Sequence, residues 1–457
     1  MQPIKLYTDL FFPLHEGRAR VKRGAPVPPE ELYAYGVQWD KEVANPDVTR
    51  IGNMELHKAD KLPVQNAMRG CLLDDNGDVV QYLSDSDWQN ASMLDGSHGQ
   101  VMIEIPTFYW KFSEDENGIQ SVMLSMVEIA GYKKVNKSYV SAYEATLDRT
   151  NNKLASVKNT SAQYRGGNNN SAWDGSYRSL LGKAATNISL TEFRTYARNR
   201  KANSYEWNCN TYQMQKILYW LFVVEYATRN CQKSYNSSLS SDGYHQGGLG
   251  AGVTNANDSK WNSEFSYYPF VPIGITDSLG NGTGEVSYSS VDSSDSTWAT
   301  VKVPRYRGVE NPFGHIWKWT DGINIQVQSD NDGGKSKVYV SDDPATWNSS
   351  NYNGYTYIGD EARTNNWIKE IIFGEDGDII PTIVGSSSQY FTDHHYTSIP
   401  NSGNVLRGLL FGGCANHGSS AGFVFSGSSG GPSYRFARIG SRLCFVPHIN
   451  YKKNQQK

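Results

Sequence analysis

Residues 307–322 read RGVENPFGHIWKWTDG, and this stretch decides the fold prediction. Its second half alternates Ile316 and Lys318 with Trp317 and Trp319. Successive side chains of a β-strand point to opposite faces, so the alternation is typical of a half-buried strand. The glycines of the stretch permit tight turns, because glycine adopts positive φ at no steric cost. The stretch therefore predicts a framework strand next to tight turns.

Two segments nearer the C-terminus extend this prediction. Residues 405–408 read VLRG and residues 439–443 read IGSRL. Together with 307–322 they resemble the sulfatase-modifying-factor branch (formylglycine-generating enzyme-like) of the C-type lectin fold, whose elements run N-x-x-G-N-V-W-E-W, V-L-R-G-G-S-W and I-G-F-R-L. The resemblance extends from residue 130 to residue 447. It implies six framework residues: Trp317, Trp319, Arg407, Gly408, Gly440 and Arg442.

Two helices are predicted before these segments. The first begins at Ser189, where Glu192 completes a capping-box pattern. The second covers residues 211–228 and has apolar residues on nearly all sides, so it should be the buried helix. The sequence therefore predicts an α+β protein, an elaborated C-type lectin fold with two helices on a small twisted antiparallel sheet and long loops. Most of residues 234–296, rich in Ser, Gly and Asn, are expected to be such loops.

The N-terminal part has a different character. Residues 1–35 carry four basic residues between 18 and 23, followed by Pro26, Pro28 and Pro29, which favours an extended arm. The arm could dock on a partner or pack on its own domain. Residues 36–129 read as strands with hairpin turns at 75–77 and 117–118. The expected division is an arm (1–35), a β-rich segment (36–129) and a lectin-like ligand-binding domain (130–450).

Composition and charge exclude some partners. The chain has 457 residues, a formal net charge of −3, and only 19% charged residues. This balance argues against non-specific nucleic-acid binding and against a polybasic membrane anchor. The longest apolar run, 217–227, is far shorter than a bilayer span, and residues 1–14 lack the pattern of a secretory signal. We therefore expect no nucleic acid, no membrane insertion, and assembly inside the producing cell.

The cysteines indicate neither disulfides nor zinc. They form no Cys-x-x-Cys pair, and their number is odd, so buried free thiols are expected. The formylglycine-making oxidase of the resembled branch uses two cysteines a few residues apart, and Cys414 has no such neighbour. The calcium-dependent sugar motif of animal lectins is also missing. The five positions are Cys71, Cys209, Cys231, Cys414 and Cys444.

Three further motifs are weak. Adjacent side chains such as His394 and His395 point in different directions, and no other ligand is spaced to join them. Residues 330–334 lack the later bidentate Glu of a calcium loop. The glycines of 247–252 do not follow a dinucleotide fingerprint. We expect no metal and no cofactor.

Residues 411–440 read FGGCANHGSSAGFVFSGSSGGPSYRFARIG, without Lys, Glu, Gln, Met or Trp. With this closing segment the chain more closely resembles retroelement-diversified variable proteins and bacteriophage receptor-binding proteins of tail or head fibres. Adenine-directed mutagenesis of Asn codons cannot produce those five residues, although a Gly/Ser-rich loop could simply lack long side chains. The exposed ligand-binding set implied by this resemblance is Cys414, Asn416, His417, Ser420, Phe423, Phe425, Tyr434, Phe436 and Arg438.

These resemblances imply a non-enzymatic bacteriophage adhesin that recognises a bacterial surface glycan or protein. It would be a virion component made in the host cytoplasm, or else lie on a bacterial cell surface. The arm would contact other virion proteins, and a homo-oligomer, most simply a trimer, is expected. One alternative is a structural decoration or collar protein whose 411–440 surface is buried by a neighbour. Another is a glycan-processing enzyme, which needs two carboxylates about 5 to 10 Å apart in a cleft.

Overall fold

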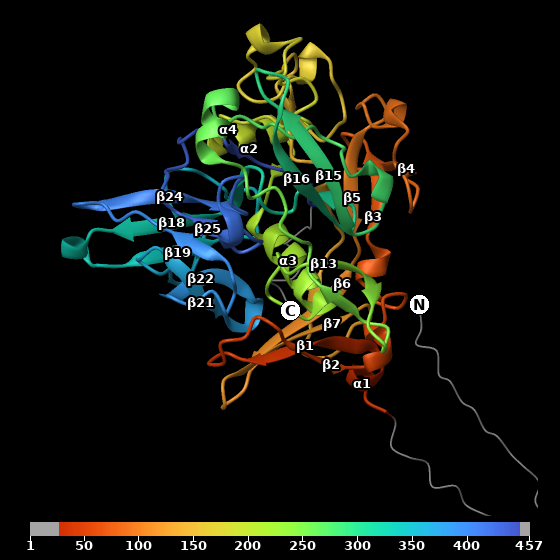
Figure 1. Ribbon diagram of the computed structural model, residues 1–457. Helices are drawn as coiled ribbons and strands as arrows, with labels where there is room; N and C mark the ends of the chain where they lie inside the picture. Colours follow the sequence, from red (N-terminus) through yellow and green to blue (C-terminus); the bar gives the residue numbers. More distant parts are fainter. Residues whose placement is uncertain (1–26, 448–457) are drawn as a thin grey trace, which may run out of the picture.

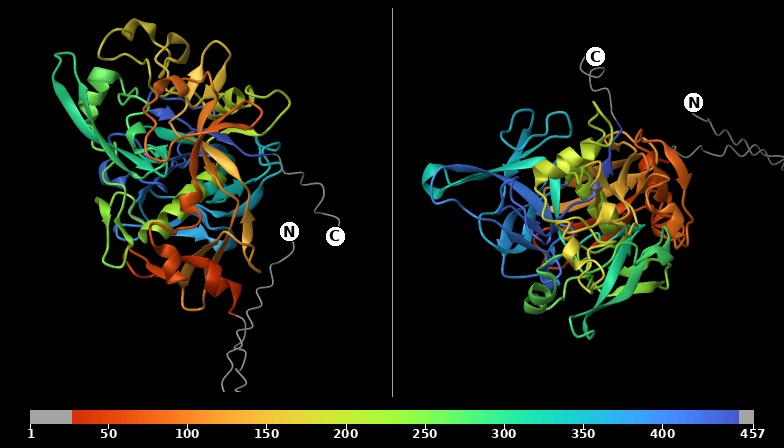
Figure 2. Two further views of the ribbon diagram at one scale, coloured as in Figure 1. Left: turned by 90° about the vertical axis from the view of Figure 1, so that its right-hand side faces the viewer. Right: turned by 90° about the horizontal axis from the view of Figure 1, so that it is seen from above.

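The computed structural model describes residues 27–447, and strands dominate it. Strands make up 35% and helices 15%, with four α-helices in the part described. The predicted α+β class, with two helices on a small sheet, is therefore wrong. Many strands are short or exposed on both faces, so they lack the apolar alternation that would have marked them in the sequence. Figures 1 and 2 place α1 (Pro29–Tyr33) at one end of the molecule and α4 (Asp258–Phe265) at the other.

The first sheet is antiparallel and belongs to the N-terminal part. The order is β2-β1-β7-β6-β8, with β1 (Ala34–Asp40), β2 (Thr49–Gly52), β6 (Phe108–Glu114), β7 (Ile119–Ser125) and β8 (Lys133–Val135). The hairpin predicted at 117–118 is confirmed, since it joins β6 to β7. Residues 1–26 of the predicted arm lie outside the described residues, and the rest of the arm forms α1 and the start of β1.

A second antiparallel sheet joins segments far apart in the sequence. Its order is β12-β27-β9-β5-β3-β4, with β3 (Arg69–Leu73), β4 (Val79–Tyr82), β5 (Gln100–Ile105), β9 (Ser138–Ser141), β12 (Trp207–Cys209) and β27 (Leu443–Phe445). The predicted hairpin at 75–77 joins β3 to β4 and is confirmed. Because β5 pairs with β9, the sheet crosses residue 130 without interruption.

The largest sheet contains Trp317 and Trp319 of the stretch 307–322, from which the fold was predicted. Its order is β20-β19-β18-β24-β25-β23-β21-β22, and β26 pairs with β18. Its strands are β18 (Trp317–Gln328), β19 (Ser336–Val340), β20 (Thr356–Asp360), β21 (Asn366–Phe373), β22 (Asp378–Gly385), β23 (His394–Tyr396), β24 (Asn404–Phe411), β25 (Ser426–Gly427) and β26 (Ile439–Gly440). The predicted framework strand is confirmed as the start of β18, but the prediction that it is half-buried is wrong. Both of its faces are covered there, and even Lys318 is only 1% exposed.

Three small sheets complete the fold. They are β10 (Thr146–Asp148) with β11 (Lys153–Ala155), β13 (Tyr235–Leu239) with β14 (His245–Gly247), and β15 (Gly284–Val291) with β16 (Thr297–Tyr306) and β17 (Val309–Glu310). Part of the stretch expected to be loops is therefore strand. The sequence did not predict these strands because few of their residues are buried, as the Ser-rich β15 shows.

Both predicted helices are confirmed. In α2 (Leu190–Arg198) the Ser189 hydroxyl accepts from the Glu192 amide, and the Glu192 carboxylate accepts in return. The helix α3 (Tyr212–Tyr226) lies at the centre of the molecule (Figure 1), and Trp220 stacks on Trp39 of β1 with ring centroids 5.9 Å apart. Helix α4, capped by Asn257, lies in the stretch expected to be loops. No helix within residues 27–447 is long and apolar enough to cross a membrane.

Buried polar groups brace this framework. Arg442 is fully enclosed and donates to the carbonyl oxygens of Ser141, Glu310 and Asn311. Gly440 and Gly408 are required for close packing, since a Cβ would lie 2.5 Å from the Ile316 Cδ1 atom and 2.8 Å from the Trp319 ring, respectively. All five cysteines are buried and free, as their number and spacing predicted, and this includes Cys414, which the resemblance to variable proteins had placed at the surface.

Candidate ligand-binding site

Four neighbouring strands of the largest sheet form the floor of a pocket. Leu410 on β24 pairs directly with Gly427 on β25, and Gly427 pairs with Tyr396 on β23. Trp319 pairs with Leu410 from the other side, and Trp317 lies two residues away on the same face of β18. Leu410, Gly427 and Tyr396 therefore form one row with the Trp317 ring beside it, and these four residues line a pocket of about 420 Å³.

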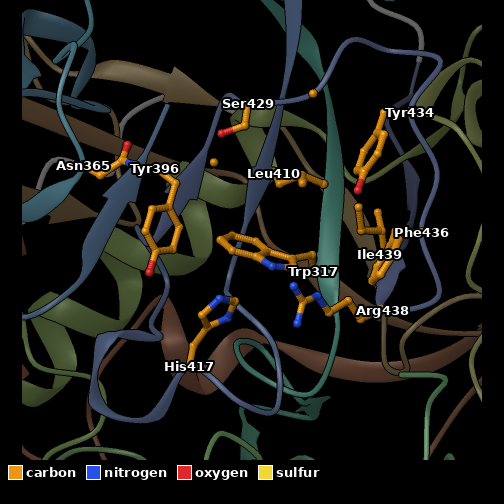
Figure 3. A pocket seen from close by; sticks show the side chains of 12 residues that line it. Trp317, Asn365, Tyr396, Leu410, His417, Ser429, Tyr434, Phe436, Arg438 and Ile439 are labelled. Atoms are coloured by element: carbon orange, nitrogen blue, oxygen red, sulfur yellow. The ribbon is translucent and has the colours of Figure 1, made fainter. Parts of the chain in front are cut away.

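The wall comes from the chain between β25 and β26. Two backbone hydrogen bonds fix its ends. The Gly408 amide donates to the Gly430 carbonyl at 3.0 Å, and the Trp317 amide donates to the Arg438 carbonyl at 2.9 Å. The rings of Tyr434 and Phe436 lie nearly parallel, 7° apart in orientation and 6.5 Å between centroids. Figure 3 places these two rings on one side of Trp317 and Tyr396 on the other. The lining is completed by Asn365, His417, Ser429, Gly430, Arg438 and Ile439.

His417 is held in the pocket by its own turn. Its Nδ1 atom accepts from the Cys414 amide at 2.9 Å and lies 3.2 Å from the Cys414 Sγ atom. Its ring meets Trp317 edge-on, with centroids 5.1 Å apart. Burial lowers the pKa of His417 to about 4 and raises the pKa of the Cys414 thiol to about 12. At neutral pH the pair is a neutral imidazole and a buried thiol, which makes it a structural contact and a poor nucleophile.

Arg438 is the cation of the pocket. Its Nη1 atom donates to the Asn416 side chain at 3.3 Å and lies 3.9 Å from an Asp258 carboxylate oxygen. The guanidinium also lies over the rings of Tyr267 and Phe436, 5.1 and 5.4 Å from their centroids. Asp258 is about half exposed, so it offsets the Arg438 charge only weakly.

Two buried carboxyl groups hold the strands under the pocket. Glu361 accepts from the Ser428 hydroxyl at 2.6 Å and from the Thr397 hydroxyl at 3.3 Å. Asp393 accepts from the amides of Val424 and Phe425 at 2.8 and 3.1 Å. Burial raises the pKa of each carboxyl group to about 8. Sequence reasoning missed both, because only the pairing of β23 with β25 brings them to this segment.

The structure separates the nine predicted ligand-binding residues into three groups. Four line the pocket (His417, Tyr434, Phe436 and Arg438), and Asn416 and Ser420 lie partly exposed beside it. Cys414, Phe423 and Phe425 are fully buried, so the prediction that they are exposed is wrong. In a segment of glycines and serines, the large apolar side chains gain most from burial, and these three take core positions. Phe423 packs among Tyr219, Phe222, Tyr306 and Phe313.

Other residues in the pocket were missed. Asn365 lies just before β21, Tyr396 lies on β23 and Leu410 lies on β24, so all three precede residue 411. The alternation of Tyr396 with the buried His395 is a strand signal, but only the sheet order shows which face meets the wall. Of the framework residues, Trp317 and Trp319 are buried, and Arg407 is partly exposed on β24.

The motifs considered for metals have structural contacts. His395 is buried against the Ser426 hydroxyl and the Ala362 carbonyl, at 2.9 and 3.0 Å. The His394 ring meets that of Trp367 edge-on. Residues 330–334 form a single 3-10 turn and its exit. Within residues 27–447, no three His, Cys, Asp or Glu side chains are grouped as metal ligands would be.

Comparison with known proteins adds remote structural likenesses. No family model matches the sequence, and no curated protein matches it. Among solved structures, PvdO from Pseudomonas aeruginosa is similar at 10% identity and a TM-score of 0.30, over 82% of this chain and 98% of that one. The U1 and P3c variants of Major Tropism Determinant are each 12% identical, with TM-scores of 0.25. They match over 83% and 87% of this chain and 71% and 88% of theirs.

Proposed function

We propose that this chain is a non-enzymatic receptor-binding protein of a bacteriophage virion, and that its pocket binds a ligand on the bacterial surface. The observation that carries the proposal is the lining of the pocket, where four aromatic rings meet a few polar groups. Such rings supply contact area at a low entropic cost, and the polar groups fix orientation. The sequence resemblance described above supplies the biological setting.

The contact surface under this proposal is smaller than the sequence suggested. It consists of the exposed members of 411–440 together with the sheet residues that face them. Retroelement diversification, if this locus undergoes it, would then act on the exposed members, while the three buried ones belong to the framework. The proposed contact residues are Trp317, Asn365, Tyr396, Asn416, His417, Ser420, Tyr434, Phe436 and Arg438.

We further propose that the N-terminal end attaches the protein to the particle. Exposed apolar side chains flank the pair of Ala34 and Ser125 at this end, because Leu32 and Tyr33 come just before β1 and Met126 comes just after β7. Between 38% and 49% of each of these three residues is exposed, which favours contact with a partner. Residues 1–35 would dock on other virion proteins, in a homo-oligomer for which a trimer is the simplest expectation.

A filled pocket tests the binding function directly. Gly427 has no positive φ, and a Cβ there would meet the Trp317 ring at an ordinary 3.6 Å, so Gly427→Leu should fill the floor without backbone strain. We expect this variant to adsorb to susceptible bacterial cells at least about tenfold more weakly than the unchanged chain, as measured with fluorescently labelled protein on a panel of strains.

The matched control is Gly385→Leu at the end of β22, where a Cβ would meet nothing within 4 Å. It should adsorb normally, and both variants should keep the melting temperature within a few degrees. Normal adsorption by a folded Gly427→Leu protein would contradict the proposal and favour a structural virion protein.

A further inference from the structure

The floor of the pocket has a gap that a ligand can enter. Gly427 is the only residue of the floor row without a side chain, and a Cβ there would lie 3.6 Å from Trp317 and 3.9 Å from the Leu410 Cβ atom. Trp317 closes the gap from below, being only 6% exposed, while Tyr434 at the rim is 48% exposed. The volume of about 420 Å³ lies within the range of small-molecule sites.

Aromatic faces bound this gap on opposite sides. Figure 3 shows Tyr396 on one side of Trp317, with the parallel pair of Tyr434 and Phe436 on the other. Aromatic faces carry partial negative charge, and they attract the weakly positive C–H groups of a saturated ring. A pyranose presents such C–H groups on its faces and its hydroxyl groups around its edge, so its chemistry matches a gap flanked by aromatic rings.

Polar tips surround the rings. Within residues 27–447, the hydroxyl groups of Tyr396, Tyr434 and Ser429 have no hydrogen-bond partner, nor does the His417 Nε2 atom. Asn365 uses its Oδ1 atom to accept from the Thr397 amide at 2.7 Å, and this leaves its Nδ2 atom for a ligand. Donors and acceptors at the edge of an aromatic site match the hydroxyl groups of a sugar.

The charge of the lining selects among sugars. Arg438 lines the pocket, and no Asp or Glu does so within the part of the chain described. The Arg438 Nη1 atom donates to Asn416, while no described residue accepts from the Nε or Nη2 atoms of Arg438. A guanidinium with two unused donors binds a carboxylate through charge-assisted hydrogen bonds. An apolar side chain of a protein receptor would leave Arg438 and the polar tips without partners.

We propose that the ligand is a saccharide unit carrying a carboxylate, a uronic acid or a related sugar acid, with its ring between Tyr396 and the Tyr434–Phe436 pair and its carboxylate on Arg438. This inference rests on the proposed function and specifies the ligand class. It makes Arg438 the residue that selects for the acid, and the aromatic rings the residues that bind any pyranose.

The test uses the full chain and methyl glycosides as probes. Dissociation constants are measured by saturation-transfer NMR for the methyl glycosides of glucuronic and galacturonic acid, and for those of glucose and galactose. We expect at least one acid to bind about tenfold more tightly than its neutral counterpart. Arg438→Gln should remove that preference, and Gly427→Leu should remove binding of both. Arg435 is exposed and lies outside the pocket, so Arg435→Gln should change neither the preference for the acid nor the binding of the glycosides.

Equal binding of the acid and neutral glycosides would overturn the inference, and so would a preference for the acid that survives Arg438→Gln. N-acetyl-tryptophan amide serves as the probe for a protein receptor, and its binding in place of the sugar acids would also reject the ligand class. In each case the proposed function stands if Gly427→Leu still loses adsorption to cells, so the two failures can be told apart.

Discussion

The two halves of segment 411–440 have similar compositions and opposite placements. In 411–428 the apolar side chains point into the core, where Cys414, Phe423 and Phe425 are fully buried, and His417 is the side chain that reaches the pocket. In 429–439 the aromatic side chains form the wall of the pocket, and Tyr434 is 48% exposed. Both halves are rich in glycine and serine, so composition does not distinguish them. The first half is held by β25 and the buried carboxyl of Asp393, whereas the second bridges β25 and β26.

The largest expected effect is on the buried half. Phe423→Ala removes a ring that packs on Phe222, Phe313 and Tyr306, and such a truncation costs about 3–5 kcal/mol because the cavity collapses only partly. Urea unfolding followed by fluorescence measures the change in the free energy of unfolding. A loss below about 1 kcal/mol would mean that this half is not core.

The comparison also shows which features the sequence could reveal. The capping box of Ser189 and Glu192, the apolar residues of α3 and the alternation at Trp317 are local signals, and each correctly predicted its element. Sheet order is not local, so the sequence did not indicate that Tyr396 and Asn365 would face Tyr434 across the pocket. The burial of Phe423 depends on partners more than 100 residues away, such as Tyr306 and Phe222.

A smaller effect is expected at the junction of the halves, where Glu361 accepts from Ser428. Burial raises its folded-state pKa to about 8, above the ordinary value of 4.5. Between these two pH values the folded protein holds a proton that the unfolded chain has lost, so the free energy of unfolding falls as pH rises. Glu361→Gln cannot titrate and still accepts from Ser428. We expect its stability to fall less steeply from pH 5 to pH 8 in urea unfolding.

The charge of Arg363 and the hydrogen bonds from Ser428 and Thr397 all act to lower the pKa of Glu361, so the rise comes from burial. At pH 5, where Glu361 is protonated in the folded protein, the variant should differ from the unchanged chain by about 1 kcal/mol or less. Glu361→Asp serves as the titrating control. Parallel pH profiles for Glu361→Gln and the unchanged chain would contradict a buried neutral carboxyl at the junction.

The smallest effect is expected on the exposed half. Tyr434→Ala and Tyr357→Ala each remove a tyrosine that is 48% exposed, one on the pocket wall and one on β20. Both should change the free energy of unfolding by about 0.5 kcal/mol or less, because little apolar area leaves the core. Only Tyr434→Ala should weaken adsorption to cells. A wall residue that costs little stability to replace can vary freely, whereas replacing Phe423 costs the scaffold much of its stability. If Tyr434→Ala destabilised the protein as much as Phe423→Ala, the wall would be framework too, and the division between the halves would fail.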